Sequence, residues 1–490
     1  MKDHAHTASG GARFVGKEAR TFAELLRRRA AEHGQVPAFT FMGAEPTGDV
    51  TLTYGELDRR ARAISLELEA RGLSGQRVLL HLPAGPTYLA SLFGCFYAGA
   101  IAVPVPAPLF DAERLGPKLL AAIAQDSGAA AALVSGPRPA EGQRLTVEGL
   151  ASHVDLIAAE AITPGPVPPD WTPQLQNSRT LAVLQYTAGH SGAPKGVRVT
   201  HANLLDNAEG LRRGFGHTQT DKILLWLPTH QGLGLIEGVL QPLYSGVPAV
   251  LLPPQVFFQR PARWLEAIST HGATISGAPD FAYALCARTV TEAERARLDL
   301  SRWRIAFTSG EQVRAETMEH FAARFAPCGF QLKAFRPVYG LTECAYLVAC
   351  GKSEEGPTLR EVTPDALARQ RITESPGAPV KLASCGPAPS LQVLIVNPTT
   401  RVARGDQEIG EVWLSGLSVA DGYWGQVATT EEAFRGRLAS AASGTRAFLR
   451  TGDLGAWAGG ELYITGRIRD VLIWEGQDLR LNDLEFDVES

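Results

Sequence analysis

The sequence predicts an α/β protein with parallel sheets covered by helices and a smaller β-rich part toward its C-terminal end. Apolar segments of strand length alternate with amphipathic segments as far as about residue 350, a pattern typical of parallel sheets with helical connections. After residue 385 the apolar segments are short and separated by turn residues, which indicates a small β-barrel-like subdomain. At 490 residues, the chain is long enough for two or three packed subdomains.

The N-terminal half begins with a helix, a strand and a second helix. Residues 53–72 carry apolar side chains on one side, with Thr53 as the cap, and predict an amphipathic helix. Residues 76–82 predict an apolar strand, and the small residues of 88–102 predict a helix. The closely spaced prolines of 103–108 predict an extended turn after that helix.

A second unit of strand and helix surrounds residues 186–196. The apolar run at 181–185 predicts a strand, and Thr200 is a typical cap for a helix that begins at residue 201. Residues 186–196 are therefore expected to form a loop between a strand and a helix.

Composition also divides the chain into larger parts. We expect a large domain over residues 1–466, followed at 467–490 by a hinge and the start of a truncated C-terminal domain. Residues 351–384 are polar, contain proline and show weak periodicity, which indicates a surface insertion. The other parts of the large domain are expected at about 1–180 and 181–350, both α/β, and at 385–466, which is β-rich. Its strands are expected at 393–396, 410–414, 448–449 and 461–464.

Charge and cysteine content exclude several classes of protein. The net charge of −4 leaves no electrostatic footprint for nucleic acid or an anionic membrane. The six cysteines show no pairing or metal-binding spacing, which argues against a disulfide framework and a zinc site. No signal peptide and no apolar run of about 18 residues is found. The sequence therefore predicts a cytoplasmic protein without membrane insertion.

The loop at 186–196 is the strongest sign of function. Its glycines allow backbone N–H groups to approach an anion, and its hydroxyls and lysine add donors and a positive charge. These residues are Thr187, Gly189, Ser191, Gly192, Lys195 and Gly196. Lys195 is followed by glycine rather than by Ser or Thr, so the loop differs from the phosphate loop of P-loop kinases. A solvated glycine-rich linker is the alternative interpretation.

A second cluster is the pentapeptide 339–343. Tyr339 offers a ring on which a flat base can stack, Thr342 a hydroxyl for phosphate and Glu343 a carboxylate for Mg²⁺. The alternative is a turn whose tyrosine packs in the core. Further along, Asp453 and the basic Arg467 could accept and donate hydrogen bonds to a ribose diol, although an aspartate after glycine could also be only a turn residue.

In this order, the three clusters resemble the adenylate-forming superfamily, and most closely its fatty acyl-AMP ligases. The resemblance covers nearly the whole chain. Further similar segments lie at 97–104, 226–228, 234–236, 240–244, 259–261, 264–268, 273–277 and 313–317. Residues 351–384 fall where acyl-AMP ligases carry an insertion that CoA ligases lack.

The resemblance implies a two-step reaction. A fatty carboxylate attacks the α-phosphorus of ATP, pyrophosphate leaves, and the acyl adenylate passes its acyl group to the thiol of an acyl carrier protein, in polyketide, nonribosomal peptide or lipid biosynthesis. Mg²⁺, bound by Glu343, assists. The implied catalytic residues are Lys195, Thr342, Glu343 and Gln231. The implied ATP- and AMP-binding residues are Thr187, Gly189, His190, Ser191, Gly192, Ser309, Gly310, Glu311, Tyr339, Gly340, Leu341, Asp453 and Arg467. The implied acyl pocket contains Gly277, Asp280 and Phe281.

The chain departs from the pattern of these ligases around the phosphates. Ala188 and His190 stand where the family has small hydroxyl residues, and Gln231-Gly232 replaces a His-Asp pair, with His230 one place early. Asp280 stands where the family tends to have Asn. The family's C-terminal lid, which carries a further catalytic lysine, would begin near Arg469, so only its first elements are expected here. A catalytically weakened adenylate-binding module and an acyl-CoA ligase therefore stay open as alternatives.

Overall fold

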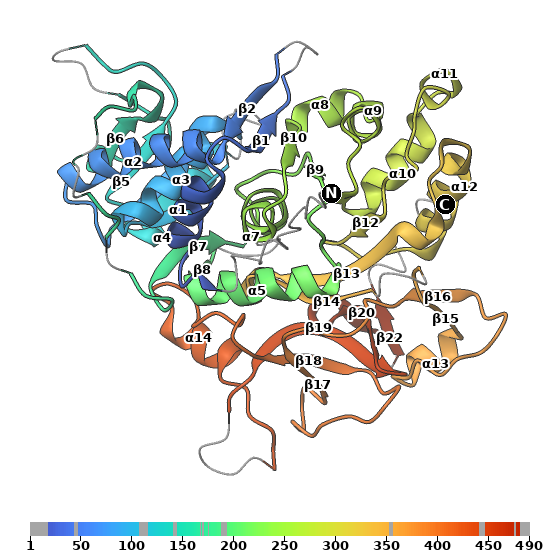
Figure 1. The fold of residues 1–490 in the computed structure, drawn as a ribbon. Helices are drawn as coiled ribbons and strands as arrows, with labels where there is room; N and C mark the ends of the chain where they lie inside the picture. The colour runs from blue at the N-terminus through green and yellow to red at the C-terminus, as the bar shows by residue number, and fades with distance from the viewer. Residues whose placement is uncertain are drawn as a thin grey trace, which may run out of the picture.

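Three sheets, with helices between and around them, build the protein in the computed structural model (Figure 1). The structure describes residues 18–43, 48–106, 116–140, 145–166, 168, 171–174, 176–187, 194–351, 356–440, 446–474 and 477–480. The blue to teal part and the green to yellow part each contain a large sheet, and the orange to red sheet lies below them in the view. The predicted α/β class is confirmed.

The first sheet has six strands in the order β6-β5-β3-β4-β7-β8. All neighbours run parallel except β7 and β8, which are antiparallel. The strands are β3 (Arg77–His81), β4 (Ile101–Pro104), β5 (Ala131–Val134), β6 (Asp155–Ala158), β7 (Leu181–Tyr186) and β8 (Gly196–Thr200). The accompanying helices are α2 (Tyr54–Ala70), α3 (Pro86–Ala98) and α4 (Gly116–Ser127).

The start of α2 was predicted correctly because its signal is local. Thr53 accepts a hydrogen bond from the backbone of Glu56, whose side chain accepts one from the backbone of Thr53. This reciprocal capping box satisfies two N–H groups that the helix leaves free.

The predicted end of the next helix was wrong. Helix α3 stops at Ala98 because Gly99 adopts a left-handed conformation with φ of 67°. The following residues, which we expected to be helix and turn, form β4 between β3 and β7, and Pro104 is paired with Leu80. Small apolar residues fit a buried strand as well as a buried helix, so the composition alone did not separate the two.

The second sheet has eight strands in the order β14-β13-β12-β11-β9-β10-β1-β2. The six strands from β13 to β1 are parallel, and the two edge strands are antiparallel to their neighbours. The strands are β1 (Pro37–Phe41), β2 (Val50–Thr53), β9 (Ile223–Leu225), β10 (Ala249–Leu251), β11 (Ile275–Ala278), β12 (Ile305–Thr308), β13 (Phe335–Leu341) and β14 (Tyr346–Cys350).

Helices of this second part fill the crossings between its strands. They are α1 (Phe22–His33), α5 (His201–Gly214), α6 (Gly232–Leu235), a π-helix (Ile236–Leu240), α7 (Gln241–Ser245), α8 (Pro254–Gln259), α9 (Ala262–His271), α10 (Asp280–Thr289), α11 (Glu292–Arg295) and α12 (Ala315–Phe325). On one side of the sheet, a cluster of aromatic rings that includes Trp226, Trp264, Tyr283 and Phe321 forms the core. None of the helices in the described ranges is both long and apolar enough to span a membrane.

The third sheet is antiparallel with the order β17-β18-β19-β20. Its strands are β17 (Gln392–Val396), β18 (Gly410–Ser415), β19 (Leu449–Ala458) and β20 (Glu461–Arg467), and α14 (Val427–Phe434) lies between β18 and β19 in the sequence. Two small hairpins accompany it. They contain β15 (Leu359–Val362), α13 (Pro364–Ala368) and β16 (Val380–Ala383), and β21 (Val471–Trp474) with β22 (Gln477–Arg480).

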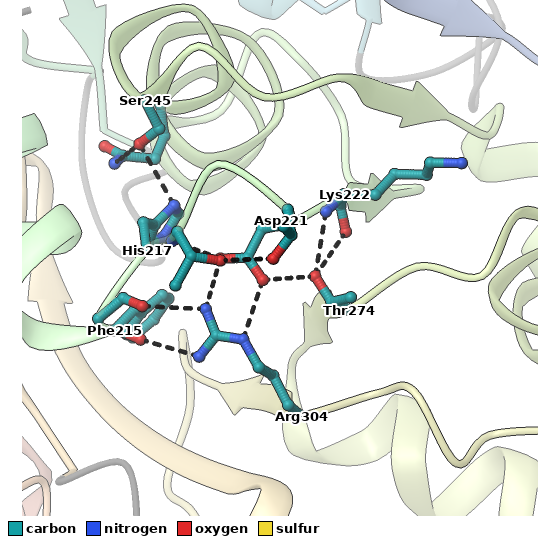
Figure 2. Close-up of polar contacts among 11 residues, drawn as sticks. Phe215, His217, Asp221, Lys222, Ser245, Thr274 and Arg304 are labelled. Carbon is teal, nitrogen blue, oxygen red and sulfur yellow. Dashed lines mark hydrogen bonds and ion pairs between the residues drawn. The ribbon is translucent and has the colours of Figure 1, made fainter. Parts of the chain in front are cut away.

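A polar network closes the amino end of the second sheet (Figure 2). Arg304 donates to both carboxylate oxygens of Asp221 and to the carbonyl oxygen of Phe215. The Thr274 hydroxyl donates to the same carboxylate at 2.8 Å. Arg304 and Thr274 directly precede β12 and β11, so these contacts fix the starts of two parallel strands. The carboxyl ends of these strands take no part in the network.

Candidate functional site

The candidate site lies at the carboxyl ends of strands β12 and β13. In open α/β sheets, this edge is where ligands bind. Ser309, Gly310 and Glu311 follow β12, and Tyr339 to Glu343 form the end of β13 and the turn after it. The fold therefore brings the implied ATP-binding residues 309–311 and the 339–343 cluster to neighbouring strand ends.

The third predicted cluster joins the second through a hydrogen bond. The Tyr339 hydroxyl donates to Asp453 Oδ2 at 2.6 Å, across a separation of 114 residues in sequence. Arg467 Nε lies 3.0 Å from Asp453 Oδ1, because the two residues are paired between β19 and β20. Burial raises the pKa of the Asp453 carboxyl, while the Arg467 guanidinium acts in the opposite direction. Tyr339 and Asp453 are buried and Arg467 is half exposed, so Arg467 is the member of this group that is accessible to a ligand.

Glu343 is linked to the phosphate-loop lysine by a residue that the sequence analysis missed. The Tyr423 hydroxyl donates to Glu343 Oε1 at 2.8 Å, and Lys195 Nζ lies 5.1 Å from the centroid of the Tyr423 ring. Tyr423 lies in the turn sequence 422–425, where an aromatic pair between two glycines was the available signal. Its distance in sequence from both partners concealed the contact.

Glu343 is a suitable ligand for Mg²⁺. Burial raises the pKa of its carboxyl, so a bound cation would favour the charged form. No group of three or more metal-ligating side chains is found in the part of the chain that the structure describes. Mg²⁺ commonly binds through one or two carboxylates together with substrate phosphates and water, and Glu343 could supply one such carboxylate.

Gly232, the residue after Gln231, and Thr342 line one small pocket. Gln185 and Ala345 also line it, and a Cβ atom on Gly232 would lie 3.8 Å from Thr342 Oγ1. Gln231 itself is exposed and is the N-cap of α6, with no hydrogen bond from its side chain to the helix. The Gln231 side chain is therefore exposed directly before the pocket-lining Gly232.

His230 does not replace the histidine that is absent at position 231 as a proton acceptor near neutral pH. The side chain of Gln185 donates to its backbone carbonyl at 2.7 Å. Burial lowers the pKa of the His230 imidazole to about 4, so the ring is neutral near pH 7.

The phosphate loop is described only at its two ends. Gly189, His190, Ser191 and Gly192 lie outside the described residues, as does Ala188. The Thr187 N–H donates to the carbonyl of Lys195 at 3.1 Å and closes the base of the loop. We expected the loop to lead directly into a helix, which was wrong, because strand β8 intervenes and pairs with β7. Valines alternate along β8 and favour a strand, and Thr200 then caps α5 as predicted.

Comparison with known proteins decides the family. Residues 26–424 match the profile described as AMP-binding enzyme. The chain is an AMP-binding enzyme. The resemblance to adenylate-forming ligases is thereby confirmed.

Named relatives of this AMP-binding enzyme include ligases of fatty acids. It is 39% identical over 482 residues to the medium-chain-fatty-acid–[acyl-carrier-protein] ligase JamA of Moorena producens (strain JHB). The aligned region covers 96% of this chain and 80% of that protein. The chain is 33% identical over 492 residues to the long-chain-fatty-acid–AMP ligase FadD28 of Mycobacterium tuberculosis (strain ATCC 25618 / H37Rv), covering 96% and 83%.

Solved structures show the same relationship. The fatty acid AMP ligase from Legionella pneumophila aligns with a TM-score of 0.86 and 35% identity, over 93% of this chain and 78% of that one. A fatty acyl-adenylate ligase from the same organism, solved with acyl adenylate and pyrophosphate, aligns with a TM-score of 0.85, 35% identity and the same coverage.

The acyl-pocket candidates of the AMP-binding enzyme have different surroundings. A Cβ atom on Gly277 would lie 2.3 Å from the Phe307 ring, so this glycine allows two strands to pack closely. Asp280 accepts hydrogen bonds from the Arg314 N–H at 3.1 Å and from the Thr317 hydroxyl at 2.7 Å. Burial raises the pKa of Asp280 to about 6. Because its carboxylate is paired with the start of α12, Asp280 adds no unpartnered charge to a fatty-acid pocket.

The residues after β12 make a tight turn beside these candidates. Gly310 has φ of 93°, a conformation that favours glycine. Glu311 accepts a hydrogen bond from the N–H of Phe281 at 2.6 Å. The Phe281 ring is 41% exposed and stacks on Phe258. Ser309 is buried, and among the described residues no partner meets its hydroxyl oxygen.

Proposed function

We propose that this AMP-binding enzyme activates a fatty acid with ATP, forms an acyl adenylate with release of pyrophosphate, and passes the acyl group to an acyl carrier protein. The observation that carries the proposal is the meeting of Tyr339, Asp453 and Arg467 beside the Glu343, Tyr423 and Lys195 group. The relatives named for fatty acids and acyl carrier protein support the choice of substrate and acceptor.

The phosphate side of the reaction depends mainly on electrostatics. Negative charge accumulates on phosphate oxygens in the transition state, and preorganised donors and cations stabilise it. Lys195, directly before β8 of the first sheet, supplies a positive charge, and Thr342, directly after β13 of the second sheet, supplies a hydroxyl. When bound at Glu343, Mg²⁺ would neutralise part of the phosphate charge.

The acid substrate would approach through the pocket next to Thr342. The exposed Gln231 offers an amide N–H to the attacking carboxylate or to the α-phosphate. Since a glutamine does not titrate, this contact positions the acid without exchanging a proton. Gly277, Asp280 and Phe281 are the proposed neighbours of the acyl chain.

The nucleoside would be held by the other half of the site. Asp453 is an acceptor and Arg467 a donor for the ribose hydroxyls, while Tyr339 and residues 309–311 would surround the adenine. The predicted loop residues 189–192 would complete the contacts with pyrophosphate. We further propose a cytoplasmic location, which fits six cysteines that are all free and buried.

Mass spectrometry of the products formed from ATP, Mg²⁺ and a mixture of fatty acids tests this function. We expect acyl adenylates of one range of chain length, and acyl transfer to a phosphopantetheinylated carrier protein but not to free CoA. Transfer to CoA would instead favour the acyl-CoA ligase. The absence of every adenylate, with any acid, would contradict the proposal.

A catalytically weakened binding module is the second candidate, and the neutral His230 and non-titrating Gln231 favour it. It predicts that ATP binds, as measured by calorimetry, without any adenylate being formed. Restoring histidine at position 231 and serine at position 190 would then not produce turnover.

A further inference from the structure

A chain segment after β18, residues 417–426, runs from the neighbourhood of Glu343 to the start of β8. We call it the crossing segment. The side-chain amide of Asn203, in α5, donates to the carbonyl oxygens of Leu417 and Val419 at 2.6 and 3.1 Å. Next along the segment, the Ala420 N–H donates to the backbone carbonyl of Glu343 at 2.9 Å. One end of the crossing segment is thus fixed beside the proposed metal ligand.

The other end of the crossing segment is fixed to the strand that leaves the phosphate loop. The Arg198 N–H donates to the carbonyl of Gly422 at 3.0 Å, and the Trp424 N–H donates to the carbonyl of Gly196 at 2.7 Å. Tyr423 lies between these two bonds. Its backbone therefore keeps a constant position relative to Lys195, which directly precedes β8.

The Tyr423 side chain contacts three other residues. Its hydroxyl donates to Glu343 Oε1 at 2.8 Å, the Lys195 ammonium lies 5.1 Å from its ring centroid, and Phe434 packs edge-on against it at 5.2 Å between centroids. Only 9% of the residue is exposed. The hydroxyl and the ring thus meet two residues that carry opposite charges.

We propose that Tyr423 is a positioning residue that holds Glu343 ready for Mg²⁺ and Lys195 ready for phosphate, an inference that rests on the proposed function. A hydrogen bond to one oxygen of a ligating carboxylate fixes the orientation of the other oxygen. The face of an aromatic ring attracts an ammonium group. Tyr423 contacts both groups and so keeps the Glu343 carboxylate and the Lys195 ammonium from pairing with each other. Glu343 then stays available for Mg²⁺ and Lys195 for phosphate.

Three variants of the 490-residue chain separate these roles. Tyr423→Phe removes the hydroxyl and keeps the ring, and Tyr423→Leu removes both. The matched control is Tyr97→Phe, because the Tyr97 hydroxyl also donates to a buried carboxylate, that of Asp58, at 2.7 Å, but in the pairing of α2 with α3. Thermal unfolding of each variant shows how much of any change is structural.

Equilibrium binding of ATP is measured by calorimetry across Mg²⁺ concentrations and also in EDTA. We expect Tyr423→Phe to raise the Mg²⁺ concentration for half-maximal tightening of ATP binding about 10-fold, with unchanged affinity in EDTA. Tyr423→Leu should in addition weaken binding in EDTA about two- to fivefold, because Lys195 loses its ring. Tyr97→Phe should change neither quantity.

A double-mutant cycle with Glu343→Gln completes the test. The glutamine oxygen still accepts a hydrogen bond from Tyr423 but is a weak ligand for Mg²⁺, so Tyr423→Phe should have no further effect on the Mg²⁺ dependence in that background. Equal Mg²⁺ dependence in Tyr423→Phe and Tyr97→Phe would overturn the role of Tyr423 alone. Failure of the wild-type chain to bind ATP at all would overturn the proposed function and this role together.

Discussion

At the scale of single residues, Asp453 connects the nucleoside half of the site. Its Oδ2 accepts the hydrogen bond from Tyr339 and its Oδ1 pairs with Arg467. The carboxylate of Asp453 therefore holds both side chains in place. The sequence indicated part of this arrangement, because the 339–343 cluster and the Asp453–Arg467 pair each contain residue types suited to a nucleotide. The hydrogen bond between Tyr339 and Asp453 was not indicated, since no local pattern records a contact across 114 residues.

Replacing this charge tests the nucleoside site. Asp453→Asn should lower ATP affinity about 10- to 100-fold, because the amide no longer holds the guanidinium in place. It should lower the free energy of unfolding by about 1.5–3 kcal/mol, the range for a hydrogen bond to a charged group. Calorimetry and denaturant unfolding measure the two effects. In contrast, Asp155→Asn breaks an exposed ion pair with Arg71 and should change neither by much. Unchanged ATP affinity in Asp453→Asn would exclude this residue from the site.

Gln231 is the second position at which a single substitution tests the proposed site. Gln231→His introduces a titratable group beside the proposed acid site, so the rate of adenylate formation should acquire a dependence on pH near the ordinary imidazole pKa of about 6.5. Pre-steady-state measurement of adenylate at several pH values checks this. The same pH profile in wild type and variant would show that residue 231 does not face the reacting groups.

At the scale of elements, the capped helices were predictable and the connections between strands were not. Thr53 and Thr200 mark the starts of α2 and α5 by local hydrogen bonds. Strand β8 was missed because its pairing with β7 is set by tertiary structure, while the sequence there offered a loop followed by a cap. The end of α3 was misplaced for a related reason, since the glycine that ends it sits in a run of small residues.

At the start of α5, the titratable side chain of His201 makes a hydrogen bond with the start of α1. His201 is buried, accepts a hydrogen bond from the Phe22 N–H at Nδ1, and its Nε2 faces Gln176 Oε1 at 2.9 Å. Burial lowers the pKa of its imidazole to about 3. Protonation of Nδ1 would remove the acceptor for the start of α1.

This arrangement predicts acid-induced loss of stability. Between the unfolded pKa of about 6.5 and the folded pKa of about 3, the unfolded chain binds more protons, so the free energy of unfolding decreases as pH falls, by up to about 1.4 kcal/mol per pH unit from this residue. His201→Gln should reduce that slope in denaturant unfolding at pH 4 to 7. His33→Gln, on an exposed position, should leave the slope unchanged. A slope that is the same in all three proteins would refute the assignment.

At the scale of the whole molecule, the amino and carboxyl ends of the strands in the second sheet carry different groups of residues. The Asp221–Arg304 network holds the amino ends of the strands together (Figure 2), and the candidate residues 309–311 and 339–343 lie at the carboxyl ends of β12 and β13. Burial alone would raise the pKa of Asp221, but hydrogen bonds from Arg304, Thr218 and Thr274 lower it below its ordinary value. The network was not predicted, because its members are spread from residue 215 to 304 with no motif.

Removing one partner of this network should affect stability but not binding. Arg304→Leu leaves Asp221 buried without its cation, and we expect a loss of about 3–5 kcal/mol in the free energy of unfolding. ATP affinity, measured below the unfolding transition, should stay within about twofold of wild type, since the site lies at the other ends of the strands. A large loss of ATP affinity in the folded variant would show that the two ends are coupled.

The α/β class and the ligase resemblance followed from the sequence because many short segments agreed along the whole chain. The sequence did not indicate every candidate residue of the site, since Tyr423 meets Glu343 and Lys195 only through contacts between segments that are distant in sequence. The central claim is that these contacts form a pocket for an acyl adenylate.

Binding of a non-hydrolysable acyl-sulfamoyl adenosine, compared with AMP by calorimetry, tests that claim most directly. Because the acyl chain and the nucleoside are bound together, the account predicts that a fatty acyl-sulfamoyl adenosine binds at least about 100-fold more tightly than AMP, in line with transition-state and intermediate analogues. Equal affinity for the two compounds, or no binding of either, would contradict it.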